Sequence, residues 1–226
     1  MEKRHRNTLT RTLIKSCFRR VLVGTLSLPF LLAASVMMPP FAESPQPLAY
    51  GVRPRPKELV KIYSIVKSNR PDISEREGWE LTEVIHGECA KHNLDPMLVL
   101  ALIDVESKFQ YAAVSPAGAR GLMQILPYVG KSLLQEIGWE DEAGWKKFQP
   151  EFLDDPVLNI KLGVHYLQDL KKSFRDLTLA LTAYNLGPTE TKNRLNNEIE
   201  VSDRYATAVL STYHKYKTSD QPTSDV

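Results

Sequence analysis

The stretch DPMLVLALIDVESKF, residues 95–109, indicates the fold of this chain more clearly than any other segment. Asp95 is a residue type that caps helix N-termini, and Pro96 suits the first turn because no helical partner awaits its missing N–H there. The positions that follow are apolar on nearly every face, which is typical of a helix that other elements surround. We therefore predict a central, buried helix over residues 97–108.

Similar start and stop signals lie on both sides of this segment. Ser74 followed by Glu77 is a capping box, Asp155-Pro156 repeats the start signal, and Gly187-Pro188 is a typical helix end. No run after the proline-rich residues 43–56 alternates apolar and polar residues between hairpin turns, so we predict an all-α domain. The expected helices cover residues 57–68, 74 to about 92, 97–108, 155–172, 176–185, and from 202 or 203 onward.

The N-terminal part of the chain has a different composition. Residues 21–38 are apolar and uncharged, and they follow a strongly basic stretch. This order is typical of an export signal, either a cleaved signal peptide or an uncleaved membrane anchor, and we favour cleavage. The expected organisation is residues 1–42 as signal peptide or N-terminal membrane anchor, 43–56 as Pro-rich linker, 57–217 as folded domain and 218–226 as disordered tail.

Composition excludes several other functions. The overall charge of +2 comes from the basic N-terminus, and the rest of the chain has more acidic than basic residues. A nucleic-acid-binding protein would need a concentrated basic face, and none is visible in the sequence. We therefore expect no nucleic-acid partner. The histidines show no metal-ligand spacing, so we expect neither a metal site nor a cofactor. Cys89 has helical spacing from Ile85, which indicates a buried thiol.

Two acidic residues, Asp104 and Glu106, interrupt the apolar helix. A carboxylate in apolar surroundings is costly, so each needs a partner or a function. Positions two apart point to nearly opposite sides of a helix, so we expect one acid at a cleft and the other solvated or paired. Glu106 is the candidate for the cleft. Burial beside Val105 and Phe109 would raise its pKa and keep it protonated, as a general acid must be.

Three further motifs carry a family resemblance. Glu106 opens ESKF, residues 114–124 read VSPAGARGLMQ, and residues 183–188 read AYNLGP. Together with the DP-start helix at 155–167, they resemble the lytic transglycosylase (SLT) domain of the lysozyme-like superfamily, over roughly residues 75–215. The resemblance implies an all-α, lysozyme-like helical domain, related to goose-type lysozymes, with a substrate cleft.

The resemblance also implies a reaction. Glu106 would protonate the oxygen of the β-1,4 bond between N-acetylmuramic acid and N-acetylglucosamine in peptidoglycan. It would then deprotonate the muramoyl sugar's own primary hydroxyl, which closes a 1,6-anhydro ring. The residues expected to contact the glycan strand are Ser115, which would bind the N-acetyl group, Met123, Gln124, Tyr184, Asn185 and Tyr205.

For some of these residues a structural role remains open. Met123 could equally be a core residue, because methionine readily fills gaps. Tyr184 and Asn185 could pack and cap the helix end before Gly187. Ser107 is expected to form local hydrogen bonds at the helix end, since no base is positioned to make it a nucleophile.

Alternative functions also remain open. The chain has no Asp or Glu between Ser107 and Gln135, which favours cyclisation over hydrolysis by a goose-type lysozyme-like muramidase, unless Asp154 or Glu190 folds into reach. A rival is a non-catalytic glycan-binding or assembly module. A third hypothesis is a wall-opening enzyme for a secretion or envelope apparatus. We expect an exported protein of the periplasm or cell envelope, with inner-membrane anchoring left open.

Overall fold

The computed structural model describes residues 55–138 and 147–219, and these residues fold into helices and loops. Within these two ranges the regular elements are helical, and strand pairing is limited to the isolated bridges Val114–Arg120 and Arg120–Ile125. The all-α prediction is therefore confirmed. The elements are α1 (Lys57–Asn69), α2 (Glu75–His92), α3 (Pro96–Ser107), α4 (Pro127–Glu136), the 3₁₀ helix η2 (Pro150–Asp154), α5 (Pro156–Phe174), α6 (Leu177–Leu186), α7 (Pro188–Asn196) and α8 (Arg204–Thr218).

Four of the predicted helix starts are confirmed by capping hydrogen bonds. The Ser74 hydroxyl accepts from the backbone N–H of Glu77 at 3.2 Å. The carboxylate of Asp95 accepts from Met97 N–H at 2.9 Å, and Asp155 and Asp176 cap α5 and α6 in the same way. Each of these bonds satisfies a backbone donor that the first helical turn leaves without a partner.

Helix α7 was not predicted. Gly187 ends α6 with a φ of 94°, but Pro188 starts α7 at once, since proline fits the first turn of a new helix. Thr191 is the one residue that α7 buries, so no apolar periodicity marks this helix in the sequence.

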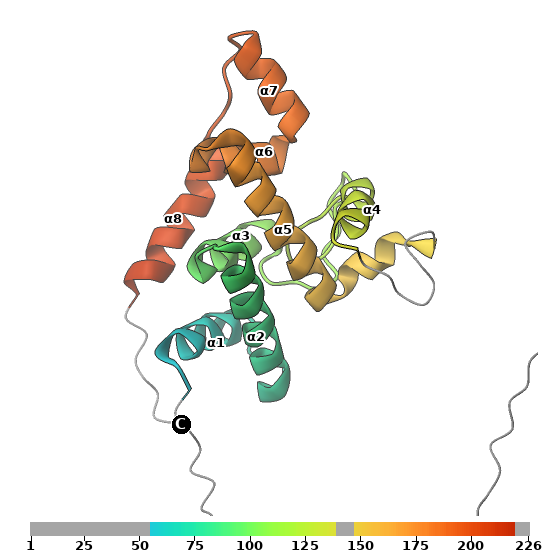
Figure 1. The fold of residues 1–226 in the computed structure, drawn as a ribbon. Coiled ribbons are helices and arrows are strands. Elements are labelled where there is room, and N and C mark those ends of the chain that lie inside the picture. The colour runs from blue at the N-terminus through green and yellow to red at the C-terminus, as the bar shows by residue number, and fades with distance from the viewer. Residues whose placement is uncertain (1–54, 139–146, 220–226) are drawn as a thin grey trace, which may run out of the picture. The chain divides into compact units, whose positions relative to one another are not determined.

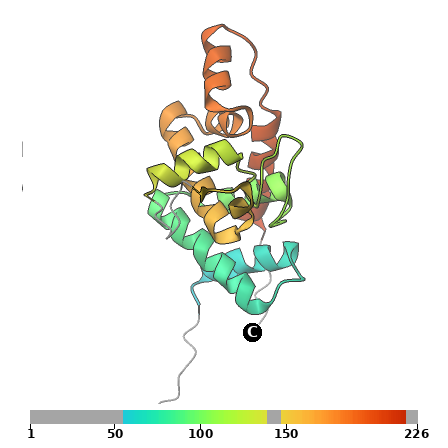
Figure 2. The same ribbon diagram turned by 90° about the vertical axis from the view of Figure 1, so that its right-hand side faces the viewer.

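Helix α3 lies in the middle of the core, as expected. Seven consecutive side chains from Met97 to Ile103 are at most 5% exposed. Helix α3 packs against α8, α1 and α2, while α5 packs against α2 and α6. Figures 1 and 2 show α8 running beside α3. Because α3 is enclosed in this way, any charged group near its end must find partners on these neighbours.

The domain boundaries can be compared with the described residues only in part. Helix α1 begins at Lys57, where we expected the folded domain to begin. Helix α8 ends at Thr218, so the first residue of the predicted disordered tail is helical. The predicted signal segment 1–42 and most of the linker 43–56 lie outside the described residues. In the described part, none of the helices combines the length and apolar character needed to cross a membrane.

Candidate active site

Glu106 is the penultimate residue of α3, and its side chain is partly buried. The phenol of Tyr205, from the first turn of α8, donates a hydrogen bond to Glu106 Oε1. Burial raises the pKa of Glu106 to about 7, while the hydrogen bond from Tyr205 opposes this rise. The carboxyl group therefore exchanges its proton near neutral pH, as a group that serves as both acid and base must.

Two tyrosines face this carboxyl group. Burial, followed by the charge of Glu106, raises the pKa of the Tyr205 and Tyr184 phenols above the usual range. Tyr184 lies on α6, and its hydroxyl donates to the carbonyl oxygen of Met123 at 2.8 Å. Both phenols are therefore neutral hydrogen-bond donors over the whole range in which Glu106 titrates.

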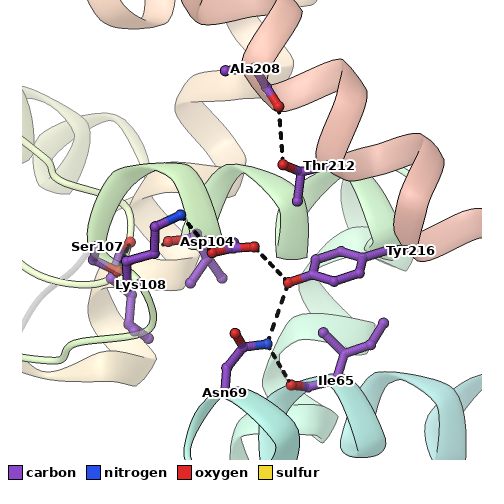
Figure 3. Close-up of polar contacts among 10 residues, drawn as sticks. Ile65, Asn69, Asp104, Ser107, Lys108, Ala208, Thr212 and Tyr216 are labelled. Atoms are coloured by element: carbon purple, nitrogen blue, oxygen red, sulfur yellow. Dashed lines mark hydrogen bonds and ion pairs between the residues drawn. The ribbon is translucent and has the colours of Figure 1, made fainter. Parts of the chain in front are cut away.

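Asp104 has different partners, as the helical spacing predicted. Tyr216 of α8 donates to Asp104 Oδ2 at 2.8 Å, and the Lys108 ammonium group donates to Oδ1 at 2.9 Å (Figure 3). Asp104 is thus the structurally paired acid, and Glu106 the acid whose charge has no cationic partner among the described contacts.

The loop that follows α3 is fastened to the end of the helix. The Ser107 hydroxyl lies within hydrogen-bond distance of the carbonyl oxygens of Leu122 and Ile103, at 2.8 and 3.2 Å. Since a hydroxyl has one proton, it donates to one of these oxygens at a time. Ser107 therefore has the local hydrogen-bonding role that we expected, and it joins the ESKF segment to the 114–124 segment.

Asn159 of α5 binds the backbone of the same loop. Its side chain is fully buried and makes three hydrogen bonds. Asn159 Oδ1 accepts from Met123 N–H at 2.7 Å, and Nδ2 donates to the carbonyl oxygens of Arg120 and Leu153 at 2.9 and 2.8 Å. This amide uses its donors and its acceptor on backbone groups, so it fixes the path of the loop beside Glu106.

Two glycines allow this close packing. Gly121 has a φ of 81°, and a Cβ there would lie 2.2 Å from both Asn159 Nδ2 and the Leu153 carbonyl oxygen. At Gly163 of α5, a Cβ would lie 2.4 Å from Met123 Sδ. Side chains at either position would push the loop away from α5.

Met123 is a core residue in this structure. Its side chain is 0% exposed and lies over Gly163, while its backbone N–H and carbonyl bind Asn159 and Tyr184. In this structure its side chain has no exposed surface, so packing of Met123 on a sugar stays a prediction. Of the two roles left open for this methionine, its position supports the structural one.

The remaining predicted contact residues differ in accessibility. Asn185 is exposed at the end of α6, one residue after the buried Tyr184. The Ser115 hydroxyl accepts from Ala119 N–H at 3.0 Å within its own turn. Gln124 has a φ of 48°, and its Nε2 donates to the carbonyl oxygens of Ala113 and Gly121, both at 2.9 Å. Ser115 and Gln124 thus both support the loop.

The two acids considered for hydrolysis are engaged in ion pairs. Arg120 donates to both carboxylate oxygens of Asp154, at 3.0 and 2.6 Å. Glu190 lies on α7, where its carboxylate is 2.8 Å from Arg194 Nε. Neither acid is among the groups that shift the pKa of Glu106.

One histidine cluster was not predicted from the sequence: His165 and Asp169 lie one turn apart on α5, and Glu136 comes from α4. His165 Nε2 lies 3.3 Å from Asp169 Oδ2 and 3.7 Å from Glu136 Oε2, with all three ligand atoms within 4.8 Å of one another. These atom types could hold a cation. However, Lys172 also pairs with Asp169 at 3.2 Å, so charge balance within the cluster does not require one.

The comparisons with known proteins agree with this arrangement. The family described as the transglycosylase SLT domain matches residues 83–206, more than half of the chain. The chain belongs to this family. The match contains Glu106, the loop after α3 and Tyr205, which are the parts of the site described above. The family assignment from the sequence motifs is therefore confirmed.

Two curated relatives are each longer than the part that this chain matches. It is 30% identical over 151 residues to the membrane-bound lytic murein transglycosylase C of Photorhabdus laumondii, covering 62% of this chain and 40% of that protein. It is also 30% identical over 102 residues to the endo-type membrane-bound lytic murein transglycosylase A of Klebsiella pneumoniae, covering 45% and 48%. The chain thus spans less than half of the length of each.

Solved structures agree on the fold. The 70 kDa soluble lytic transglycosylase Slt70 of Escherichia coli matches with a TM-score of 0.55 at 21% identity, covering 71% of this chain and 29% of that one. An inactive mutant of the lytic transglycosylase Slt of Pseudomonas aeruginosa matches with a TM-score of 0.50 at 25% identity, covering 59% and 23%. The fold of the SLT domain is thus all-α and lysozyme-like, as predicted.

Proposed function

We propose that this chain is a peptidoglycan lytic transglycosylase in which Glu106 is the single catalytic acid and base. The observation that carries the proposal is the state of Glu106. Its carboxyl group is buried without a cationic partner, receives a hydrogen bond from Tyr205, and has a pKa raised to about 7. A carboxyl group of this kind can donate a proton at neutral pH and take one back in the next step.

The reaction begins when protonated Glu106 donates its proton to the glycosidic oxygen between N-acetylmuramic acid and N-acetylglucosamine. The C–O bond to the leaving sugar then breaks. Glu106, now a carboxylate, accepts the proton of the muramoyl primary hydroxyl as that oxygen bonds to the anomeric carbon. The product is a 1,6-anhydro end, and Glu106 has recovered its proton. Tyr205, a neutral donor, stabilises the carboxylate stage through its hydrogen bond.

Cyclisation is favoured over hydrolysis because inverting hydrolysis requires a second carboxylate that activates water. Asp154 and Glu190, the acids that could have filled this role, are paired with Arg120 and Arg194. The sugar's own hydroxyl therefore replaces water as the nucleophile. No cofactor takes part in this reaction.

The glycan strand would reach Glu106 along the loop after α3 and the end of α6. The exposed Asn185 is the best placed of the predicted contact residues, and Tyr205 lies directly at the carboxyl group. Ser115, Gln124 and Tyr184 would contribute through the loop that they support. For Ser115, Gln124 and Asn185 the proposed contact rests on the family resemblance, and for Tyr184 and Tyr205 also on their interaction with Glu106.

The substrate places the enzyme in the bacterial cell envelope, acting in wall remodelling or turnover. The basic and apolar N-terminal segment supports export, and the matched transglycosylases C and A are named membrane-bound. Periplasmic action is therefore proposed, with residues 1–42 either removed or kept as an inner-membrane anchor. Service to a secretion or envelope apparatus remains a hypothesis that a pull-down of the exported form would test.

The decisive experiment is mass spectrometry of the fragments that the purified full chain releases from peptidoglycan. Anhydro ends from the wild type and none from Glu106→Gln would support the proposal. Asp104→Asn is the matched control, since it neutralises an acid two residues away and should still release anhydro products. Reducing ends would instead indicate hydrolysis. Binding without any product would favour the non-catalytic glycan-binding module.

A further inference from the structure

Helix α8 contacts the carboxylates of α3 through three tyrosines. Tyr205 donates to Glu106, Tyr213 to Asp95 and Tyr216 to Asp104. Because Asp95 caps the start of α3 and the other two acids lie near its end, α8 is bonded to α3 along most of its length. These bonds add direction to the apolar packing between the two helices.

Of the two tyrosine contacts that do not involve Glu106, the contact of Tyr216 has the more closely defined surroundings. Its side chain is 7% exposed, and its hydroxyl donates to Asp104 Oδ2 at 2.8 Å. Asn69 of α1 donates to the same hydroxyl at 3.4 Å and to the Ile65 carbonyl oxygen at 2.9 Å. Figure 3 shows the Tyr216 ring reaching from α8 with its hydroxyl between Asp104 and Asn69. Three helices therefore meet at one phenol.

Helix geometry connects this phenol to the catalytic carboxyl group. Tyr205 and Tyr216 are separated by about three turns, so they point to nearly the same side of α8, roughly 16 Å apart along its axis. Their acceptors Glu106 and Asp104 lie two positions apart and point away from each other on α3. Helix α8 therefore holds the last turns of α3 at two points, and a helix of this length transmits a shift at one point to the other.

We propose that Tyr216 and Asp104 are positioning residues for the catalytic centre, because their hydrogen bond sets how α8 lies along α3 and so holds the Tyr205 hydroxyl on Glu106. This inference rests on the proposed function only where it predicts an effect on the rate of catalysis. The two hydrogen bonds are features of the fold and do not rest on that function; the inference is that the Tyr205–Glu106 bond depends on the Asp104–Tyr216 bond.

The ionisable groups around both bonds are few. Tyr205 from α8 and Tyr184 from α6 face Glu106, and both phenols have raised pKa values. Around Tyr216 the ionisable groups are Asp104 from α3, Lys108 bound to Asp104, and Lys215, which lines a cavity of about 190 Å³ with Asp104 and Tyr216. Tyr216 itself has a raised pKa, caused first by burial and then by its bond to Asp104.

A displaced Tyr205 hydroxyl would change Glu106 in a predictable direction. The bond from Tyr205 lowers the pKa of Glu106, against the larger effect of burial. Weakening this bond removes stabilisation of the carboxylate, so the pKa of Glu106 must rise. Loss of the distant Tyr216 hydroxyl should therefore have the same sign of effect as loss of the Tyr205 hydroxyl, and a smaller size.

The test measures the pKa of Glu106 directly, without relying on activity. Full chain labelled with ¹³C-glutamate is titrated by NMR, and the Glu106 carboxyl signal is assigned by its absence in Glu106→Gln. We expect Tyr205→Phe to raise the pKa by about one unit and Tyr216→Phe by about half a unit. The double variant should match Tyr205→Phe alone, because Tyr216 acts through Tyr205.

Two variants control for simple destabilisation. Tyr213→Phe removes a matched phenol from the same helix, yet leaves Asp95 bound to Lys217 and Met97 N–H, so the pKa of Glu106 should not change. Asp104→Asn keeps Tyr216 and weakens its bond, and should reproduce the direction of Tyr216→Phe; it also serves if Tyr216→Phe fails to fold. The kcat for peptidoglycan should fall about threefold in Tyr216→Phe with KM unchanged.

Several outcomes would overturn the inference. An unchanged pKa in Tyr216→Phe and Asp104→Asn, an equal shift in Tyr213→Phe, or additive shifts in the double variant would each show that Tyr216 does not act through Tyr205. These results are separable from the proposed function. A chain that shows the expected pKa shifts but releases no anhydro products would refute the activity and leave the positioning role intact.

Discussion

The last turns of α3 carry two acids, Asp104 and Glu106, whose surroundings differ in charge. Both Asp104 and Glu106 accept a hydrogen bond from a tyrosine of α8. On the Asp104 side, Lys108 adds an ammonium group at 2.9 Å. On the Glu106 side the described contacts include no cation, and burial raises the pKa to about 7. The difference teaches that a nearby cation, rather than the position in the helix, separates a structural carboxylate from a catalytic acid.

The fold can bury Glu106 without a cationic partner because its carboxyl group can remain protonated and neutral. A buried charge without a partner is costly, but a carboxyl group whose pKa lies near 7 avoids much of that cost by holding its proton. Asp104 can stay charged without holding a proton, since Lys108 and Tyr216 each donate a hydrogen bond to one of its two oxygens. The two acids should therefore respond in opposite ways when each is replaced by its amide.

The largest difference should appear in activity. Glu106→Gln removes the group that both donates and accepts the proton, so we expect the rate of peptidoglycan cleavage to fall by about 10³-fold or more. Asp104→Asn keeps this group and should retain activity within about tenfold. The measurement is the initial rate of anhydro-product release by each full-length variant at pH 6 to 7.

Equal losses in the two variants would contradict the comparison. In that case Asp104 would take a direct part in the reaction, or the loss would come from a general disturbance of α3. Thermal unfolding of both proteins separates these explanations, since a folded Asp104→Asn protein without activity would point to the former.

The second prediction concerns the loop after α3, which Ser107 joins to the end of the helix next to Glu106. Asn159→Ala would leave Met123 N–H and the Arg120 and Leu153 carbonyl oxygens without their buried partner. We expect a loss of about 3 kcal/mol in the free energy of unfolding, because buried unsatisfied groups and the lost side chain both contribute. Urea unfolding measures this value, and peptidoglycan cleavage should fall as well.

Asn197→Ala is a matched control, since Asn197 is exposed and its side chain bonds one carbonyl oxygen of the nearby residue Asn193. Its stability should change by less than about 0.5 kcal/mol. If Asn159→Ala were as mild as this control, the loop beside Glu106 would be held by other contacts than those of Asn159.

Most of the helices could be predicted from the sequence, because local signals mark where they start, whereas α4 and α7 were not predicted. Ser74, Asp95, Asp155 and Asp176 mark helix starts, and each forms the expected capping bond. The separation of the two acids followed from helical periodicity alone. The direction of the Glu106 pKa shift could also be predicted, since burial of a carboxyl group disfavours its charged form.

The roles within the loop could not be predicted in this way. Whether Met123 faces a sugar or the core depends on Gly163 and Asn159, which lie on α5 and far away in sequence. The bond between Tyr216 and Asp104 likewise joins residues 112 positions apart. Such contacts depend on which helices pack against each other, and apolar periodicity shows which face of a helix is buried but not its partner.

The third prediction is that the two acids affect stability with opposite signs at high pH. Burial raises the pKa of Glu106 in the folded state, so folding favours the protonated form. Its stability contribution is fully present below about pH 4.5 and is lost as pH rises through about 7. Glu106→Gln should therefore be more stable than the wild type at pH 8.5, by about 3 kcal/mol, and similar to it at pH 4.

Asp104→Asn should show the reverse at pH 8.5, losing about 1 kcal/mol because its partners Lys108 and Tyr216 lose a charged acceptor. Urea unfolding at the two pH values measures both effects. A Glu106→Gln protein that is less stable than the wild type at pH 8.5 would mean that the Glu106 carboxylate is stabilised by partners beyond Tyr205.

The smallest expected effect tests what Lys108 contributes to the Asp104 side. Lys108→Gln removes the cation but keeps most of the side chain, and the Lys108 side chain is 73% exposed. An exposed ion pair at this helical spacing contributes about 0.5 kcal/mol, so the loss of stability should be of this size at low salt and vanish at 1 M salt. The pKa of Glu106 should stay near 7 in this variant, because the Tyr216 bond to Asp104 remains and Lys108 does not contribute to the Glu106 shift. A Glu106 pKa that moved with Lys108→Gln would show that the charges on the two sides of α3 are coupled directly, and the separation between a structural and a catalytic acid would then be one of degree.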